Sequence, residues 1–423
     1  MKVLIIGGGG REHALAWRLA GSPGVTQLFC APGNPGIAQV ADLAPMKSND
    51  VPEITKFVRR GKIELVVIGP EDPLALGLSD ALREAGVLVM GPSRAAAQLE
   101  SDKWFAKEIM RQQAIPTAEA KSFTDPLSAE EYVKAKDDPV VIKASGLAAG
   151  KGVTLCYRTS DALETIDRLM RKKVFGDAGK RIVIEELLSG PECSIFALVD
   201  RRTIYMLEPA QDHKPLEEGD TGPMTGGMGA YSPTPAVTPE VLGQVERDIL
   251  VPIVDGMLRD GIEYQGVLFA GIMLTPNGPK VLEFNCRFGD PETQPLMMRL
   301  KSDPLEMMLA VARGKLADLE LRWDPRPAMC VVATSKGYPG TPTVGMPISG
   351  ITEADAMPDV RVFHGATEIR DGQLCTSGGR VLGVTAIGNT FTEAKRRAYA
   401  ALEKIHFDGM HYRKDIGHQA VNL

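Results

Sequence analysis

The segment Val281–Gln294 constrains the fold of this chain most, because it joins an apolar strand to a dense run of polar groups. Side chains alternate between the two faces of a β-strand, so Glu283, Asn285 and Arg287 are expected on one face. A carboxylate and an amide oxygen two residues apart suit Mg²⁺ or Mn²⁺, which prefer oxygen ligands. The neighbouring guanidinium can bind a phosphate or a carboxylate. The pattern predicts Glu283 and Asn285 as metal ligands, and the alternative is an edge strand with a solvated polar face.

Length, charge and cysteine pattern exclude several classes of protein. A chain of 423 residues exceeds what one hydrophobic core supports, so two to four domains are expected. The net charge of −6 argues against nucleic acid as the main partner, which would require a basic face. Six scattered cysteines without a Cys-x-x-Cys pair indicate a reducing compartment, and no apolar run reaches the roughly 18 residues of a membrane helix. We therefore expect a cytoplasmic protein without nucleic-acid or membrane partners.

The first 100 residues carry the pattern of an open parallel α/β sheet. A helix is expected at 11–20, after the first strand. Apolar strands are expected at residues 2–6, 27–30, 65–68 and 87–90. Each strand runs into a loop rich in glycine or proline, and ligands of such sheets bind at the carboxyl ends of the strands. These loops are therefore expected at one ligand-binding edge of a domain that covers residues 1–100.

Residues 101–189 have the pattern of a linker helix followed by a small α+β lobe. The helix is expected at 101–112 with Ser101 as its N-cap, because a serine hydroxyl can accept a hydrogen bond from the first turn. Strands of the lobe are expected at 140–143, 153–156 and 182–186. The glycine-rich loop 146–152 is expected to be mobile from its composition.

Two further α+β units follow, at residues 190–327 and 328–423. The first contains a helix that starts at Pro239 after the N-cap Thr238, and a strand that turns at Asn277-Gly278 into the metal strand. That strand is expected at 267–274. In the last unit, strands are expected at 330–334 and 381–386 and a helix at 392–405. The chain is thus predicted to be a multidomain protein of α/β and α+β units.

Four consecutive glycines, Gly7–Gly10, suggest a dinucleotide-binding turn, but the rest of that pattern is missing. The third glycine position holds Glu12, and the second strand ends in Phe29-Cys30-Ala31 without an acid for a ribose hydroxyl. What remains is a glycine loop at a helix N-terminus, where backbone N–H groups favour an anion such as a sugar phosphate. A purely structural tight turn is the alternative.

Two lysines lie close to the glycine-rich loop of the small lobe. Lys143 ends an apolar strand, and Lys151 is within the loop itself. The loop is not a Walker A motif, because only three residues separate Gly146 from Gly150 and Gly152 stands where Ser or Thr should bind Mg²⁺. A flexible flap that carries a cation to a phosphate is favoured over two solvated lysines.

Two segments outside the metal strand are also candidates for a site. Residues 182–188 form a strand that runs into the link between the two α+β lobes, and nucleotide pockets often lie at such interdomain clefts. A plain connecting strand is the alternative. Residues 212–231 form a long polar, glycine-rich segment with little expected regular structure, and such loops are usually functional. His213 in this segment is interpreted as a local hydrogen-bonding residue.

Together these segments resemble the ATP-grasp ligases and, within them, the phosphoribosylamine–glycine ligase family. The resemblance spans essentially the whole chain, and only the set of motifs makes it specific. The motifs are Gly7–Ala14, Ile142–Ala144, Gly146–Val153, Gln211–Lys214, Thr225–Tyr231, Leu282–Gln294, Gly378–Leu382 and Tyr412–Gly417.

The resemblance implies a fold and a reaction. The fold is an N-terminal open parallel α/β domain, a two-lobed ATP-grasp core with a lid at 101–189 and a core lobe at 190–327, and a small C-terminal α+β domain. The reaction joins glycine to 5-phosphoribosylamine with ATP in purine biosynthesis, through phosphorylation of the glycine carboxylate. A monomer is expected, with transient contact to the enzyme that supplies phosphoribosylamine. Another acceptor, a carboxylase and an inactive regulatory protein are the alternatives.

The resemblance also assigns roles to residues. Arg287, Lys151 and Asp290 are expected to be catalytic. The nucleotide is expected to contact Lys103, Lys143, Lys151, Gly152, Glu185, Glu186, Leu188 and Glu192. The substrates are expected to contact Gly9, Gly10, Arg11, Asp212, Lys214, Gly226, Gly227, Gly229 and Glu292, with Asp290 and Glu292 at the glycine amino group. Three positions, Ser145, Pro215 and Met224, depart from the usual residues of the family.

Overall fold

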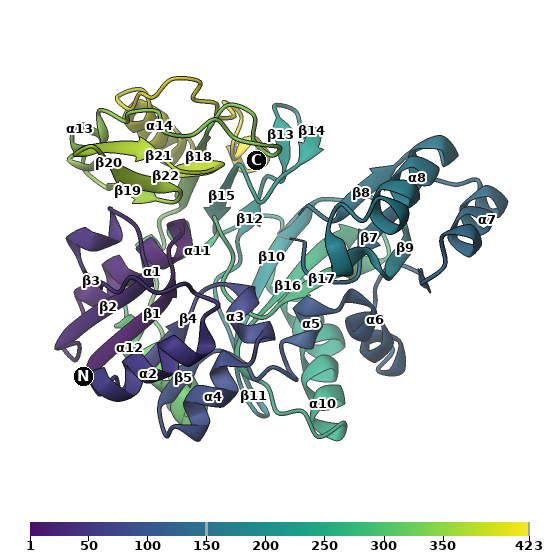
Figure 1. The fold of residues 1–423 in the computed structure, drawn as a ribbon, viewed down its shortest axis with the longest axis horizontal. Helices are drawn as coiled ribbons and strands as arrows, with labels where there is room; N and C mark the ends of the chain where they lie inside the picture. The colour runs from purple at the N-terminus through teal and green to yellow at the C-terminus, as the bar shows by residue number, and fades with distance from the viewer. Residues whose placement is uncertain (149–150, 422–423) are drawn as a thin grey trace.

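The structure is a computed structural model that describes residues 1–148 and 151–421. The N-terminal domain, the C-terminal domain and the lid lobe surround a central antiparallel sheet, and the lid lobe projects to one side (Figure 1). Ala149 and Gly150, in the loop expected to be mobile, lie outside the described residues. No helix within the described ranges combines the length and the apolar character that crossing a membrane requires.

The N-terminal domain is the predicted open parallel sheet, with strand order β3-β2-β1-β4-β5. Its strands are β1 Lys2–Gly7, β2 Gln27–Pro32, β3 Asp42–Leu43, β4 Leu65–Ile68 and β5 Leu88–Met90. Its helices are α1 Gly10–Ala20, α2 Val51–Gly61, α3 Glu71–Ala75 and α4 Leu78–Glu84. Because all pairings are parallel, the glycine loop after β1 and the Gly69-Pro70 turn after β4 meet at the carboxyl edge.

Two linker helices, α5 Gln98–Ser101 and α6 Lys103–Gln112, lead from this domain to the lid. The prediction of Ser101 as N-cap is wrong, because Ser101 ends α5. The cap of α6 is Asp102, whose carboxylate accepts the N–H groups of Trp104 and Phe105 at 3.0 and 3.3 Å. A carboxylate satisfies two donors of the first turn, where a hydroxyl commonly satisfies one.

The lid lobe is an antiparallel sheet with order β6-β9-β7-β8, covered by helices. The strands are β6 Ala120–Phe123, β7 Val140–Ala144, β8 Val153–Cys156 and β9 Ile182–Glu186. The helices are α7 Pro126–Lys136 and α8 Thr159–Ile166, and a turn of π-helix follows at Asp167–Arg171. The three predicted strands are confirmed, and the lobe has a hydrophobic cluster of its own around Ile142, Ile166 and Ile184.

The core lobe is an antiparallel sheet with order β11-β10-β16-β17. Its strands are β10 Glu192–Asp200, β11 Thr203–Met206, β16 Gln265–Thr275 and β17 Gly278–Asn285, and its helices are α9 Pro239–Val245, α10 Val251–Arg259, α11 Thr293–Arg299 and α12 Pro304–Arg313. The predicted hairpin is confirmed, with Gly278 at φ +100° in its turn. Thr238 caps α9 as predicted.

The C-terminal domain shares its sheet with the segment that was expected to lack regular structure. The sheet order is β12-β15-β18-β22-β19, and the strands are β12 Gln211–Asp212, β15 Gly229–Ser232, β18 Ala328–Thr334, β22 Arg380–Ile387 and β19 Val360–His364. The hairpins β13 Pro215–Glu217 with β14 Thr221–Met224, and β20 Thr367–Arg370 with β21 Gln373–Thr376, flank it, as do helices α13 Ile351–Asp355, α14 Phe391–Leu402 and α15 His418–Val421. The expectation for residues 212–231 is therefore wrong, because pairing with the distant strand β18 orders them.

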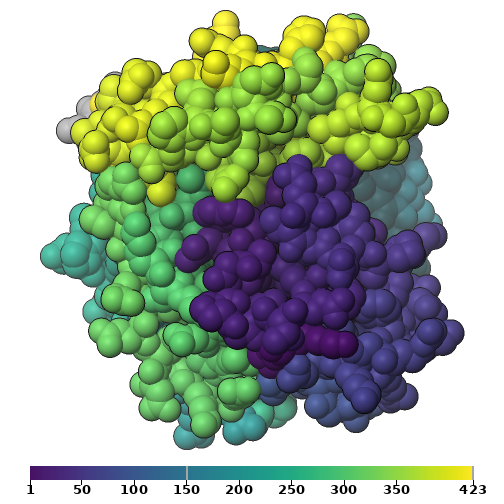
Figure 2. Space-filling model, turned by 90° about the vertical axis from the view of Figure 1, so that its left-hand side faces the viewer, coloured from purple at the N-terminus to yellow at the C-terminus, as the bar shows by residue number. Residues whose placement is uncertain are grey.

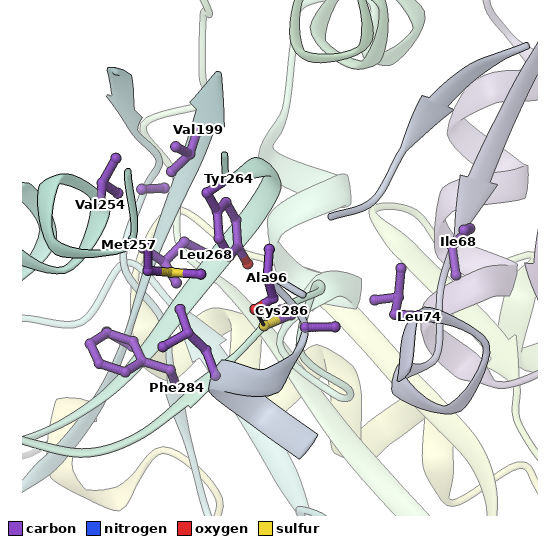
Figure 3. Close-up of a cluster of buried hydrophobic side chains, with 14 of the residues drawn as sticks. Ile68, Leu74, Ala96, Val199, Val254, Met257, Tyr264, Leu268, Phe284 and Cys286 are labelled. Carbon is purple, nitrogen blue, oxygen red and sulfur yellow. Dashed lines mark hydrogen bonds between the residues drawn. The ribbon is translucent and has the colours of Figure 1, made fainter. Parts of the chain in front are cut away.

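Hydrophobic clusters join the domains into one body. One cluster runs from Ile68 and Leu74 of the N-terminal domain through Ala96 to Tyr264 and Phe284 of the core lobe (Figure 3). The C-terminal domain lies directly on the N-terminal domain (Figure 2). There Phe363 belongs to the same cluster as residues of α1 and β2. This assembly brings residues from every domain to one region.

Candidate active site

A cavity of about 420 Å³ opens where the lid, the core lobe and the ends of the N- and C-terminal domains meet. The lining includes the amide of Asn285 and charged side chains from all four: Arg11, Glu71, Glu100, Lys103, Lys107, Lys143, Glu185, Glu186, Glu192, Asp212, Lys214, Glu283, Arg287, Asp290, Glu292 and Arg380. Most of the residues expected at the site therefore share one cavity, although they come from positions as far apart as Arg11 and Glu292.

The metal strand β17 presents its predicted ligands to this cavity. Glu283 and Asn285 both line it, while Phe284 packs into the hydrophobic cluster behind the strand. Burial works to raise the pKa of Glu283, but the cations of Lys214, Lys143 and Lys103 lower it overall. An ionised carboxylate beside an amide oxygen fits a divalent cation that prefers oxygen ligands.

Arg287 is held between two carboxylates that come from outside the core lobe. Its Nε lies 3.2 Å from Glu71 Oε2, and its second terminal nitrogen lies 2.8 Å from Glu100 Oε1. Burial raises the pKa of Glu100 to about 7 despite the opposing effect of Arg287. Burial also works to raise the pKa of Glu71, yet Arg287 and Arg11 lower it to about 2. The guanidinium is thus fixed at the end of the metal strand.

Three lysines form a cationic wall on the lid side. Glu185 lies 2.9 Å from Lys143 Nζ and 3.2 Å from Lys107 Nζ, and Lys143 also donates to Leu282 O at 2.8 Å. Burial lowers the pKa of Lys103, and it lowers the pKa of Lys107 to about 8. Buried ammonium groups with few carboxylate partners would be stabilised by an anion, so this wall suits phosphates.

The link between lid and core lobe lies beside an apolar part of the same cavity. Glu186 and Leu188 line it, together with Leu155, Met273 and Leu282. Glu186 is held by Lys280 Nζ at 3.0 Å and by the Glu119 N–H at 3.1 Å. A flat apolar slot next to a cationic wall is an arrangement that accepts a nucleoside phosphate.

The ammonium group of Lys214 lies between the carboxylates of Glu192 and Glu283. Its Nζ is 3.1 Å from Glu192 Oε2 and 3.9 Å from Glu283 Oε1. Burial raises the pKa of Asp212 to about 7, and burial also raises the pKa of Glu292, which accepts from Ser194 Oγ at 3.1 Å. The resemblance assigned Lys214 to a sugar phosphate, whereas here it adjoins Glu283, the expected metal ligand.

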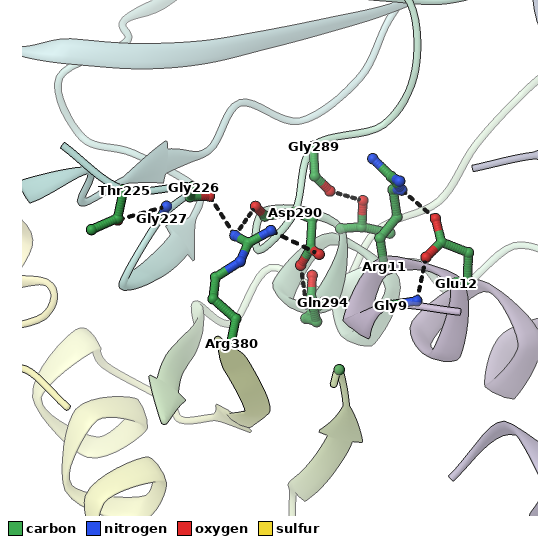
Figure 4. A network of polar contacts seen from close by, with 12 residues as sticks. Gly9, Arg11, Glu12, Thr225, Gly226, Gly227, Gly289, Asp290, Gln294 and Arg380 are labelled. Atoms are coloured by element: carbon green, nitrogen blue, oxygen red, sulfur yellow. Dashed lines mark hydrogen bonds and ion pairs between the residues drawn. The ribbon is translucent and has the colours of Figure 1, made fainter. Parts of the chain in front are cut away.

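A second cavity of about 290 Å³ lies on the other side of Asp290 and Arg380, which line both cavities. Its lining includes Gly8, Gly9 and Gly10 at the N-terminus of α1, and Gln294. Arg380 donates to Gly226 O and, at 2.5 Å, to Asp290 O, and its other terminal nitrogen lies 3.1 Å from Asp290 Oδ2 (Figure 4).

Gln294 lines the second cavity, and Glu12 binds the glycine loop beside it. Gln294 Nε2 donates to Asp290 Oδ1 at 2.7 Å, while its buried Oε1 has no hydrogen-bond partner among the described residues. Glu12 Oε2 accepts from the Gly9 N–H at 2.6 Å, and Glu12 Oε1 accepts from Arg11 Nε at 2.6 Å (Figure 4). A buried acceptor without a donor favours a ligand that carries a hydroxyl or amine.

Three expected site residues lie elsewhere in the described part of the chain. Gly227 and Gly229 line neither cavity: a Cβ at Gly227 would lie 2.5 Å from Pro291 Cδ, and one at Gly229 would lie 2.7 Å from Cys330 O. Both glycines thus permit close packing. Lys151 is exposed outside the two linings, on the loop that contains the undescribed Ala149 and Gly150.

Among the described residues, the sequence interpretation missed five charged or amide side chains that line the cavities, namely Glu71, Glu100, Lys107, Gln294 and Arg380. Glu71 and Arg380 lie in segments that had been singled out, the turn after β4 and the motif Gly378–Leu382. Their chemistry depends on Arg287 and Asp290, which are 216 and 90 positions away. No local spacing signals such pairs.

Family models match almost the whole chain. Residues 1–100 match the N domain of phosphoribosylglycinamide synthetase, residues 101–293 its ATP-grasp (A) domain, and residues 328–419 its C domain.

Curated relatives agree over their full lengths. A phosphoribosylamine–glycine ligase of Rhodopirellula baltica is 51% identical, with 99% of this chain and 98% of the relative covered. One of Agrobacterium fabrum is 48% identical, with 100% and 99% covered.

Solved structures show the same arrangement of domains. The crystal structure of phosphoribosylamine–glycine ligase from Thermotoga maritima superposes with a TM-score of 0.81 at 33% identity, covering 98% of this chain and 100% of that one. Biotin carboxylase from Campylobacter jejuni, in complex with an ATP analogue, gives a TM-score of 0.73 at 16% identity, covering 98% and 93%. The second likeness concerns the fold alone.

Proposed function

The chain belongs to the phosphoribosylglycinamide synthetase family, and we propose that its two cavities together carry out the ligase reaction of that family. The enzyme joins the carboxyl group of glycine to the amine of 5-phosphoribosylamine with ATP. The products are glycinamide ribonucleotide, ADP and phosphate, and the reaction belongs to purine biosynthesis. The observation that carries the proposal is the wall formed by Asp290 and Arg380, which separates a nucleotide-sized cavity from a second polar one.

The first cavity binds ATP. The apolar slot beside Glu186 and Leu188 takes the adenine, Glu192 takes the ribose, and Lys103 and Lys143 neutralise the phosphates. Gly152 lets the loop fold back tightly where it lines the cavity, because a Cβ there would lie 2.7 Å from Ala148 Cβ. Lys151 of the same loop is the further candidate for a phosphate contact.

Glu283 and Asn285 would hold the divalent cation that ATP-grasp enzymes generally use, and Mg²⁺ fits these oxygen ligands best. When bound, such a cation neutralises charge on the phosphates during transfer. Arg287 contributes a fixed positive charge next to them, because Glu71 and Glu100 hold its guanidinium in one orientation.

Glycine binds at the junction of the two cavities. Its ammonium group faces the carboxylates of Glu292 and Asp290, and its carboxylate faces Lys214. A carboxylate oxygen attacks the γ-phosphorus of ATP, ADP leaves, and glycyl phosphate forms. The amine of phosphoribosylamine then attacks the carbonyl carbon, loses a proton, and expels inorganic phosphate.

The second cavity binds phosphoribosylamine. The backbone around Gly9 and Gly10, together with Arg380, holds the phosphate, and Gln294 Oε1 accepts a ribose hydroxyl. Arg11 closes the wall between the cavities, where its guanidinium donates to Phe288 O at 3.1 Å. The amine then points across Asp290 toward the activated glycine.

Omission of single substrates tests this proposal. ADP release is measured with phosphoribosylamine generated in situ, and with ATP, glycine, phosphoribosylamine and Mg²⁺ each left out in turn. Release that requires all four, with glycinamide ribonucleotide as product, supports the proposal. Release that requires bicarbonate or another acid instead of glycine overturns the substrate assignment. We also expect the enzyme to be a monomer and to be located in the cytoplasm.

A further inference from the structure

The C-terminal motif Tyr412–Gly417 lines neither cavity and has no role in the proposed reaction. In the structure it lies against the segment that carries two cavity residues, Asp212 and Lys214. Helix α15 also lies beside the β13–β14 hairpin that follows this segment, because His418 Nε2 is 3.5 Å from Asp220 Oδ2. The motif is therefore bonded to the residues on either side of Lys214, namely His213 and Pro215.

His213 is the centre of these contacts. Asp212 and Lys214 line the first cavity, whereas the side chain of His213 is 1% exposed and turned toward the C-terminal segment. His213 Nε2 accepts from the Gly417 N–H at 3.0 Å, so it carries no proton, and Nδ1–H donates to Asp220 Oδ1 at 3.3 Å. Gly417 has φ +74°, a conformation that glycine adopts without strain.

Arg413 holds the far end of the loop that runs from His213 to Asp220. It is fully buried, and its guanidinium binds Asp220 at 2.8 Å, both oxygens of Asp415 at 2.7 and 2.8 Å, and the carbonyl of Pro215 at 3.1 Å. Asp415 also accepts from the Gly219 N–H at 2.8 Å. The loop from His213 to Asp220 is therefore bonded to the C-terminal segment at four of its residues.

His213, Asp220 and His418 could be mistaken for a metal site, because their ligand atoms lie within 4.8 Å of one another. The hydrogen bonds argue against it. His213 Nε2 is already used by Gly417, and its Nδ1 carries the proton. Arg413 already places a positive charge on Asp220, which is the charge a metal ion would provide. The ring nitrogens of His213 and the carboxylate of Asp220 therefore already have protein partners, and they bind the two segments to each other.

We infer that the segment Arg413–Gln419 is a positioning element, which holds Asp212 and Lys214 toward the substrates by anchoring His213 from the opposite side of the chain. The inference rests on the proposed function, which places these two side chains at glycine. Lys214 must keep its ammonium 3.1 Å from Glu192 and 3.9 Å from Glu283, and a long side chain holds such a position only if its backbone is fixed.

Substitution of His213 tests this inference. His213→Leu removes both hydrogen bonds, and we expect kcat/KM for glycine to fall about tenfold to a hundredfold while the KM for ATP stays within about twofold. His213→Gln keeps an acceptor for Gly417 and should recover part of the loss. His406→Leu, the same change at an exposed histidine of the same domain, is the control and should leave both constants unchanged.

A second variant keeps the test valid where His213→Leu does not fold. Gln419→Ala removes the bond to Gln211, which also binds Tyr231 and Thr234. We expect a smaller change in the same direction, and faster hydrogen exchange at the His213 amide, which donates to Gly229 O. Wild-type enzyme without glycine-dependent turnover would refute the proposed function. Active wild type, with unchanged glycine constants and exchange in all the variants, would refute the positioning role alone.

Discussion

Two carboxylates from outside the metal strand determine how Arg287 can act. Glu71 comes from the N-terminal domain and Glu100 from the linker, and both bind the guanidinium directly. A cation held in this way needs no reorganisation when negative charge develops on a phosphoryl group, and such preorganisation is a large part of catalysis. At the scale of single residues, the site thus depends on side chains that are distant in sequence.

Glu283→Gln is expected to lower turnover at least a hundredfold, because it removes the only charged ligand expected on β17 while keeping the shape of the side chain. The dependence on Mg²⁺ should shift to higher concentration. ADP release measured across Mg²⁺ concentrations checks this, with circular dichroism to show that the fold is intact. Glu263→Gln, at an exposed position of the same lobe, is the control. A well-folded Glu283→Gln enzyme with normal turnover would mean that the metal assignment is wrong.

Arg380→Met is expected to raise the KM for phosphoribosylamine about tenfold to a hundredfold, since charge-assisted hydrogen bonds contribute about 1.5–3 kcal/mol. The affinity for ATP should hardly change, because the proposed phosphate contacts Lys103 and Lys143 line the first cavity alone, whereas Arg380 also lines the second. Steady-state kinetics with each substrate varied check this. Arg370→Met, at an exposed position of the same domain, serves as the matched control. An equal loss of ATP affinity would contradict the placement of the acceptor.

At the scale of elements, helix α1 connects the second cavity to the C-terminal domain. Its first residues line that cavity, and three residues later His13 Nδ1 accepts from the His364 N–H at 2.7 Å. Asn34, from the loop after β2, donates to His364 O at 2.8 Å and to Gly8 O at 2.9 Å. One helix and one loop thus fix strand β19 against the glycine loop.

This contact predicts a loss of stability in acid. Burial, with smaller effects of His364 and Arg361, lowers the pKa of His13 from 6.5 to about 3. Burial also lowers the pKa of His364 to about 4. As pH falls below 6.5, the unfolded chain binds protons that the folded chain does not, so stability decreases until the folded pKa is reached.

His13→Asn keeps an acceptor for the His364 N–H and removes one of the two titrating groups. Between about pH 7.5 and about pH 5.5, the wild type should lose roughly 1 kcal/mol more stability than this variant. Urea-unfolding midpoints at both pH values measure the difference. The comparison cancels groups such as Glu100, whose pKa is raised and which are the same in both proteins. Equal losses would show that His13 is protonated in the folded state.

Elements with a strong local pattern were predictable from sequence, and elements that depend on distant partners were not. The apolar runs of β1, β4 and β7 and the Asn277-Gly278 turn correspond to the observed strands and hairpin. The long central strand β10 was missed, because a continuous apolar run does not distinguish a strand from a buried helix. β12 and β15 were missed because their order comes from pairing with β18.

The site shows the same division. Glu283 and Asn285 follow the strand periodicity of β17, and both line the first cavity. Arg287 lines it too, but β17 ends at Asn285, so the expectation that Arg287 belongs to the same strand is wrong. Glu71 and Arg380 lack such a pattern, because their partners are reached only through the packing of separate domains. Sequence therefore identified a strand whose polar side chains line the cavity, but not the distant side chains that bind Arg287 and Asp290.

At the scale of the whole molecule, the first cavity has walls from every domain, so a bound nucleotide should stabilise the chain as a unit. MgATP at about a hundredfold excess over its Kd should raise the free energy of unfolding by about 2.7 kcal/mol. Thermal unfolding with and without MgATP measures this. ATP with a chelator should stabilise less, because Glu283 and Asn285 then face the phosphates without a cation. Equal stabilisation under both conditions would contradict a metal-bridged nucleotide.

The central claim is that the site activates glycine as an acyl phosphate before the amine in the second cavity attacks. Glycine labelled with ¹⁸O in its carboxylate tests this most directly, because the attacking oxygen stays with phosphorus when phosphate leaves. Mass spectrometry of the inorganic phosphate after one turnover should show one labelled oxygen per phosphate, in a reaction that requires phosphoribosylamine. Phosphate without the label, formed together with glycinamide ribonucleotide, would contradict the glycyl phosphate route.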